Sequence, residues 1–248
     1  MKENRFDFNI DGIAATGFFA ANGGNERSAI VVCHGWGGNR RLWRLPEKIK
    51  NKVIKRGMAV ISIDMYGCGE SRGDYRDMTY GFWADDVARA VRYVRGVLGI
   101  NTVGVFGFSS GSAAALRCAA ETGEPDFIVS VATCATPNIG MAEGGVECDI
   151  PNANETRRFM GKDVGRNFFV DCIDNSPDRS LDIINVPVLI LQGGEDNKYR
   201  IADAEFAAEK IKNSLLIKYD EGTHSLDNCA TAAANDTVFW LEQNGFLL

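Results

Sequence analysis

The 248-residue chain lacks long hydrophobic runs. No stretch approaches the roughly 18 uncharged apolar residues that a membrane-spanning helix needs, so no membrane span is predicted. The charged N-terminal segment MKENRFDFNIDG is not followed by an apolar stretch that could serve as a secretory signal. A cytoplasmic location is therefore expected.

The chain also lacks an excess of positive charge and any close pair of cysteines. Its formal net charge is −6, whereas proteins that bind nucleic acid through phosphates usually carry a basic face, so no nucleic-acid partner is expected. The seven cysteines are odd in number and scattered, and no two form a CxxC pair. This argues against a structural zinc site and against a disulfide framework, and most of the cysteines are interpreted as small buried hydrophobic residues.

Short apolar runs alternate with longer amphipathic stretches along most of the chain. Most runs are too short for buried helices and are rich in Val and Ile, which is typical of strands covered on both faces. They span residues 29–33, 59–63, 103–106, 127–132, 186–191 and 215–219. Helical patterns lie between them, most clearly at 87–98 and 226–241, and residues 5–21 are predicted to form an antiparallel hairpin. This alternation predicts the α/β class, with a mostly parallel sheet behind an N-terminal β-hairpin.

One long segment interrupts the alternation. Residues 137–182 contain no clear buried strand, and a helix is predicted at 154–169. Simple connections are rarely this long, so we interpret the segment as a cap insertion over the carboxyl edge of the sheet, where open α/β sheets bind ligands. The core would then comprise residues 1–136 and 183–248. Phe159, Phe168 and Phe169 either line an apolar pocket or pin the insertion to the core, and a surface excursion without function is the alternative.

The sequence GFSSG at residues 107–111 has the form GxSxG. It follows the run 103–106 and precedes small residues that suit a helix packed close to the sheet. In this context it predicts a nucleophile elbow, a sharp strand-to-helix turn that strains and exposes the central serine. Ser109 is therefore the predicted nucleophile, and the N–H of Ser110 a predicted oxyanion donor. The alternative is a turn whose serine only caps the helix.

The sequence contains only two histidines, which narrows the search for a general base. His224 follows the last predicted strand, where a loop can reach over the elbow, so it is the predicted base. Asp196 follows the run 186–191 and would orient the imidazole, which gives the chain order serine, acid, histidine. Glu195 is the alternative acid, because one residue of register decides which carboxylate faces inward.

A glycine-rich turn, HGWGG at residues 34–38, closes the run 29–33. Such a turn lets a backbone N–H point at a substrate oxygen, so the N–H of Trp36 is the second predicted oxyanion donor. His34 is predicted to be structural and to form hydrogen bonds within its own loop. No glycine loop fits the phosphate-binding P-loop or the dinucleotide motif, and neither a cofactor nor a metal is expected.

Five motifs occur in order along the chain: HGWGG, DMYGCGES, GFSSG, GGED and GTH. In this order they resemble the motifs of the α/β-hydrolase superfamily. The chain length and the insertion before the acid-bearing strand resemble the small capped intracellular esterases, which include cinnamoyl and feruloyl esterases. The resemblance implies an α/β-hydrolase fold and a cap that shapes the acyl or alcohol pocket. GFSSG departs from the histidine-containing GHSxG that is more usual in this group.

Together these features predict a serine hydrolase that cleaves carboxylic esters of small molecules through an acyl-enzyme on Ser109. Short-chain and aromatic acyl groups are the expected substrates. The near alternative is a thioesterase, amidase or peptidase with the same triad, and the distant one is a non-catalytic ligand-binding protein, because a fold alone does not prove activity. A homodimer is compatible with the sequence, since homo-oligomers are common.

Overall fold

The computed structural model describes residues 3–21, 26–137, 151–198 and 201–247. Among these residues, eight strands form one sheet in the order β1-β2-β4-β3-β5-β6-β9-β10. The strands are β1 Glu3–Ile10, β2 Ile13–Ala20, β3 Ser28–Cys33, β4 Met58–Ile63, β5 Thr102–Phe108, β6 Ile128–Val131, β9 Val188–Gly193 and β10 Ser214–Tyr219. Neighbours from β4 to β10 are parallel, whereas β1 and β2 pair antiparallel and β2 is antiparallel to β4. The predicted mostly parallel sheet with an N-terminal hairpin is confirmed.

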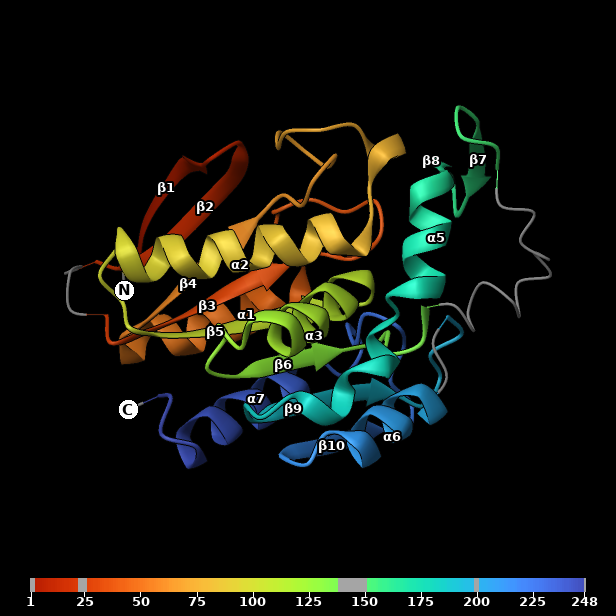
Figure 1. Ribbon diagram of the computed structural model, residues 1–248. Helices are drawn as coiled ribbons and strands as arrows, with labels where there is room; N and C mark the ends of the chain where they lie inside the picture. The colour runs from red at the N-terminus through yellow and green to blue at the C-terminus, as the bar shows by residue number, and fades with distance from the viewer. Residues whose placement is uncertain (1–2, 22–25, 138–150, 199–200, 248) are drawn as a thin grey trace.

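Helices cover both faces of this sheet (Figure 1). They are α1 Arg44–Val53, α2 Tyr80–Gly96, α3 Ser110–Thr122, α5 Arg166–Asp174, α6 Ile201–Lys210 and α7 Ala230–Gln243, and short 3-10 helices span Ile54–Arg56, Tyr75–Asp77, Pro177–Arg179 and Leu181–Ile183. Helix α2 begins where the side chain of Thr79 accepts a hydrogen bond from the N–H of Phe82, which satisfies one unpaired donor of its first turn. None of the helices in the described residues is long and apolar enough to cross a membrane.

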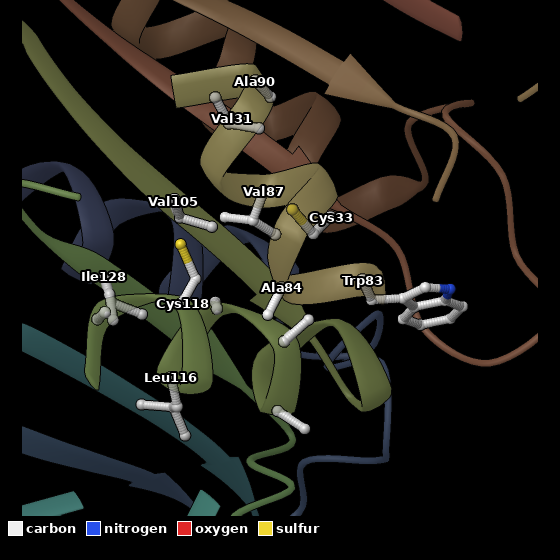
Figure 2. Close-up of a cluster of buried hydrophobic side chains, with 14 of the residues drawn as sticks. Val31, Cys33, Trp83, Ala84, Val87, Ala90, Val105, Leu116, Cys118 and Ile128 are labelled. Atoms are coloured by element: carbon white, nitrogen blue, oxygen red, sulfur yellow. The ribbon is translucent and has the colours of Figure 1, made fainter. Parts of the chain in front are cut away.

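The alternation of side chains along the central strands builds two cores. In β3, Val31 and Cys33 belong to the core that α2 and α3 cover, whereas Ile30 and Val32 belong to the core that α1 and α7 cover. Figure 2 shows the first core, in which Val31 and Cys33 lie near Val87 of α2. Burial on both faces explains why the central strands are continuous apolar runs. The six cysteines of the described residues are free thiols, and five of them are buried, as predicted.

The chain between β6 and β9 differs from its prediction. The helix predicted at 154–169 is wrong, because a two-stranded antiparallel hairpin, β7 Thr156–Phe159 and β8 Lys162–Gly165, occupies most of that range and α5 begins only at Arg166. Met160 and Gly161 turn the hairpin with positive φ angles of 44° and 79°, a conformation that a helix does not contain. Residues 138–150 of the predicted insertion lie outside the described residues. Figure 1 shows the hairpin and α5 together at one end of the sheet.

Candidate active site

A sharp turn joins β5 to α3 at Ser109, which has φ 54° and ψ −121°. Both glycines of GFSSG are required by close approaches of the backbone. A Cβ on Gly107 would lie 2.5 Å from the carbonyl oxygen of Gly111, and a Cβ on Gly111 would lie 2.5 Å from that of His34. Helix α3 therefore packs directly on the end of β3, and its N-terminus begins at Ser110 beside the Ser109 side chain.

The three side chains predicted as the triad form one chain of hydrogen bonds. His224 Nε2 lies 3.1 Å from Ser109 Oγ, and His224 Nδ1 lies 2.9 Å and 3.0 Å from the two carboxylate oxygens of Asp196. The Asp196 side chain is fully buried and the imidazole is 15% exposed. Because a carboxylate only accepts, Nδ1 is the donor to Asp196, and in the corresponding tautomer of the neutral ring Nε2 can accept from the serine hydroxyl.

The pairing register of β9 and β10 places the loop that carries Asp196 next to the loop that carries His224. Tyr219 pairs with Gly193, and the N–H of Gly194 donates to the carbonyl of Tyr219 at 2.8 Å. A Cβ on Gly193 would lie 2.2 Å from the carbonyl oxygen of Gly222, so only glycine lets the two loops meet. Glu195, the alternative acid, is exposed and donates its N–H to Gly222, whereas Asp196 faces the imidazole.

The loop after β3 lies against the elbow and is fixed by His34. The buried imidazole donates from Nδ1 to the carbonyl of Gly35 at 2.8 Å and accepts from the N–H of Met65 at Nε2, 3.1 Å away. Burial lowers the pKa of His34 to about 4, so the ring is neutral at pH 7 and can serve as an acceptor. The predicted bond within the loop is present, and a second bond anchors the loop to the chain after β4.

The model of the alpha/beta hydrolase fold family matches residues 28–174, which is more than half of the chain and includes both the loop at 34–38 and the elbow. The chain belongs to the α/β-hydrolase family.

Similar proteins agree with this assignment. The AB hydrolase superfamily protein YisY of Bacillus subtilis is 28% identical, over 79% of this α/β-hydrolase and 84% of that protein. Est1E from Butyrivibrio proteoclasticus, solved with ferulic acid bound, matches with a TM-score of 0.80 at 20% identity, covering 97% and 99% of the two chains. An esterase from Exiguobacterium antarcticum matches with a TM-score of 0.69 at 19% identity, covering 93% and 95%. At these identities the solved structures show a shared fold.

In this α/β-hydrolase, the Trp36 side chain joins the loop after β3 to the hairpin. Its ring packs against Phe159 and Phe168, and its Nε1–H donates to the carbonyl of Met160 at 3.1 Å. The next residue, Gly37, donates its N–H to the hydroxyl of Tyr75 at 3.2 Å. Sequence reasoning missed Tyr75 and Met160, because their role depends on partners far away in the sequence.

A cavity of about 540 Å³ opens at Ser109 and His224. Trp36, Phe108 and Met160 provide apolar walls, and Asn197, Lys198 and Thr223 are among the polar residues that line it. Its volume lies within the range of small-molecule sites. Phe159, Phe168 and Phe169 are absent from this lining. Phe168 and Phe169 are buried, and Phe168 packs on both Tyr80 and Phe169. Of the two interpretations of these aromatic residues, the geometry favours pinning of the segment to the core.

A larger cavity, of about 910 Å³, lies between the N-terminal hairpin, α1 and the loop after β4. It is lined by charged side chains that pair with one another, such as Arg40 with Asp64 and Lys50 with Glu47. Neither Ser109 nor His224 lines it. The smaller cavity is therefore the candidate active site. In the described residues, no group of three or more His, Cys, Asp or Glu side chains is arranged to hold a metal ion.

Proposed function

We propose that this α/β-hydrolase cleaves carboxylic esters of small molecules by acyl transfer to Ser109. The observation that carries the proposal is the unbroken hydrogen-bond chain from Ser109 through His224 to Asp196 at the floor of a small-molecule cavity. A serine hydroxyl is a weak nucleophile until a base removes its proton, and this chain supplies both the base and the group that orients it.

In the proposed first half-reaction, Ser109 Oγ attacks the ester carbonyl carbon while His224 Nε2 takes the hydroxyl proton. Asp196 stabilises the imidazolium that forms. The tetrahedral intermediate then collapses, the C–O bond of the ester breaks, and the alcohol leaves with the proton held by His224. In the second half-reaction, His224 removes a proton from water, the hydroxide attacks the acyl-enzyme, and the carboxylic acid is released as Ser109 regains its proton.

The backbone N–H groups of Trp36 and Ser110 are the proposed oxyanion donors. Ser110 opens α3, where the positive end of the helix dipole favours a developing negative charge. Trp36 lies on the loop that His34 and Tyr75 fix, so its N–H would be held in place before the substrate binds. Such donors act mainly on the transition state, because the charge develops only there.

The segment 137–182 is proposed as a cap over this site. Its hairpin supplies Met160 to the cavity wall, and α5 is tied to the core by Asp171, which accepts hydrogen bonds from the N–H of Gly81 and from Arg117. Apolar contact with Trp36, Phe108 and Met160 supports a short-chain or aromatic acyl group. Est1E, solved with ferulic acid bound, and the esterase from Exiguobacterium antarcticum have a similar fold and support the same choice of substrate.

The test is hydrolysis of p-nitrophenyl esters from acetate to octanoate, together with methyl ferulate. Ser109→Ala is expected to lower turnover by roughly a thousandfold or more, and the double variant with His224→Gln should lose little beyond that, because the two residues act as a unit. Ser214→Ala, on β10 and away from the cavity, is the matched control that keeps wild-type turnover. A folded Ser109→Ala protein with an undiminished rate would refute the proposal.

Two further measurements separate the alternatives. An ester, a thioester and an amide that share one acyl group would show whether the same triad serves a thioesterase, an amidase or a peptidase. Labelling by a fluorophosphonate that Ser109→Ala abolishes is expected of any of these enzymes. Ligand binding without turnover or labelling would instead indicate a non-catalytic binding protein.

A further inference from the structure

Gln192 is the second-last residue of strand β9, just before the loop that carries Asp196. It is a buried polar residue that the proposed mechanism does not use. Its side chain is fully buried. Its amide nitrogen lies 3.1 Å from Asp196 Oδ2, and its amide oxygen lies 3.2 Å from the backbone nitrogen of Thr133. A buried amide of this kind is costly unless both of its ends find partners.

The partners fix the orientation of the amide. The backbone N–H of Thr133 can only donate, so the side-chain oxygen of Gln192 must face it. The amide NH₂ group is then directed at Asp196 Oδ2, and the Lys198 backbone N–H donates to the other carboxylate oxygen at 2.8 Å. Each carboxylate oxygen therefore receives one donor in addition to His224 Nδ1. Hydrogen bonds donated to a carboxylate favour its charged form.

The backbone at the end of β6, close to Thr133, also contacts the proposed nucleophile. The N–H of Ser109 donates to the carbonyl of Val131 at 2.9 Å, two residues before Thr133, and the N–H of Ala132 donates to the carbonyl of Leu191 at 3.1 Å. Residues 131–133, at and just after the end of β6, are thus hydrogen-bonded both to the elbow and to the side chain of Gln192. Through this short path, Asp196 and Ser109 are placed relative to one common piece of backbone.

We propose that Gln192 is a positioning residue, whose amide holds Asp196 at a fixed place relative to Ser109 and so aligns the His224 imidazole between them. The inference rests on the proposed function of the triad and names a residue outside it. Gln192 is not among the residues that line the cavity, and its amide nitrogen is hydrogen-bonded to Asp196, so its proposed effect on the reaction passes through that carboxylate.

Other charged groups near the acid lie on three segments. Glu195 and Lys198 flank Asp196 on its own loop and are exposed, and Asp203 on α6 is held by the N–H of Ala135 and by Thr136. The loop between β10 and α7 carries exposed Asp220 and Glu221 and half-buried Asp227. None of these side chains is substituted in the Gln192 variants, so a pH dependence that appears only in a variant is assigned to the substituted residue.

The first test uses Gln192→Met, which keeps the length of the side chain and removes both hydrogen bonds. We expect kcat to fall roughly ten- to a hundredfold, as for the loss of a hydrogen bond to a charged group, with little change in KM because the cavity is untouched. Thr237→Val is the matched control: it removes a buried hydrogen bond to the carbonyl of Ala233 within α7, outside the cavity lining, and should keep the wild-type kcat.

A second readout needs no substrate. Because the chain has only two histidines, the imidazole N–H protons of ¹⁵N-histidine-labelled protein can be assigned with a His34→Gln variant. The His224 Nδ1–H proton, donated to Asp196, is expected far downfield in the wild type. It should move upfield or be lost to exchange in Gln192→Met and stay in place in Thr237→Val.

The third test introduces a titrating group with Gln192→Glu. While protonated, the new carboxyl can donate to Asp196 as the amide does, so the variant should follow the wild-type profile in that pH range. When it ionises, two carboxylates face each other and repel, and a descending limb should appear on the alkaline side of the kcat/KM profile. A residue with a merely structural role would not create such a limb.

The outcomes are separable from those of the ester hypothesis. A folded Gln192→Met protein with a wild-type kcat and an unmoved His224 proton would overturn the positioning role. The expected change in that proton would support it, even if the wild type turned over none of the esters tested. The latter result would contradict only the proposed substrate.

Discussion

The two histidines of this chain differ in burial and in their hydrogen-bond partners. His224 lies at the cavity with its imidazole partly exposed and bonded to Ser109 and Asp196, whereas His34 is buried and bonded to two backbone groups. A ring that must exchange protons needs access to the substrate, and a ring that holds a loop needs a fixed protonation state. The local sequence predicted different roles for them, because His224 follows the last strand and His34 begins a glycine-rich turn.

The low pKa of His34 predicts a loss of stability in acid. Burial lowers the pKa to about 4 in the folded protein, against about 6.5 in the unfolded chain. Between these values the unfolded state binds more protons, so the free energy of unfolding should fall as the pH drops from about 6.5 to 4, by roughly 3 kcal/mol in all. Urea unfolding of the wild type and of His34→Gln across this range measures it, since glutamine can make both hydrogen bonds without titrating. Equal pH slopes in the two proteins would contradict the prediction.

Residue types in a pattern were enough to find Ser109, Asp196 and His224, which the structure brings within hydrogen-bond distance of one another. They were not enough to find Gln192 or Tyr75. Each of these two residues forms hydrogen bonds with groups that only strand register and loop packing bring close to it. Neither residue lies in a recognisable motif. The catalytic roles themselves, the homodimer and the cytoplasmic location stay predictions.

At the scale of elements, the β7–β8 hairpin shows where local pattern fails. The alternation over residues 156–165 is short, and the apolar residues that follow it belong to α5, so the two together resemble one helix. What decides the structure is the turn at Met160 and Gly161 and the attachment of its tip to Trp36. The strands of the central sheet were predicted well, because burial on both faces leaves an unmistakable apolar run.

Met160 adopts a positive φ that residues other than Gly, Asn and Asp rarely adopt, and it lines the cavity. Met160→Asn should relieve about 1 kcal/mol of backbone strain and raise Tm by about 2–4 °C. It should also lower kcat/KM for octanoate esters relative to acetate esters, because an apolar wall is lost. Differential scanning calorimetry and the ester panel measure the two effects.

Met160→Leu is the matched comparison, since it keeps both the strain and an apolar side chain. Its Tm and its acyl preference should therefore stay close to those of the wild type. An acyl preference that Met160→Asn leaves unchanged would remove Met160 from the proposed acyl site.

At the scale of the whole molecule, the candidate active site and the C-terminal segment around Phe246 lie at opposite ends of the sheet. Ser109, Asp196 and His224 follow the carboxyl ends of β5, β9 and β10. At the other end the chain returns after α7, where Phe246 stacks on Phe127 with ring centroids 4.4 Å apart and its carbonyl accepts from Ser28 Oγ. Phe127 packs against Gly104 on β5, about 16 Å along the strand from Ser109.

This separation predicts that stability can change without activity. Phe246→Ala should lower the free energy of unfolding by about 2–3 kcal/mol, at or below the usual cost of a core Phe, because the ring is only half-buried. The kcat of the folded variant should equal that of the wild type. Phe239→Ala on α7, whose side chain is 61% exposed, should shift the unfolding free energy by less than about 0.5 kcal/mol. A kcat that falls with Phe246→Ala would show that the two ends are coupled.

The segment between β6 and β9 leaves one strand and returns to its immediate neighbour in the sheet. Its two ends are therefore held together by the ladder of those strands, and the entropy of closing the loop rises only slowly with its length. Insertions, deletions and wholesale exchange of this segment can accumulate over generations while the strand ends beneath it keep their spacing. The relative positions of Ser109 and Asp196, which follow the ends of β5 and β9, therefore do not depend on the length of this segment.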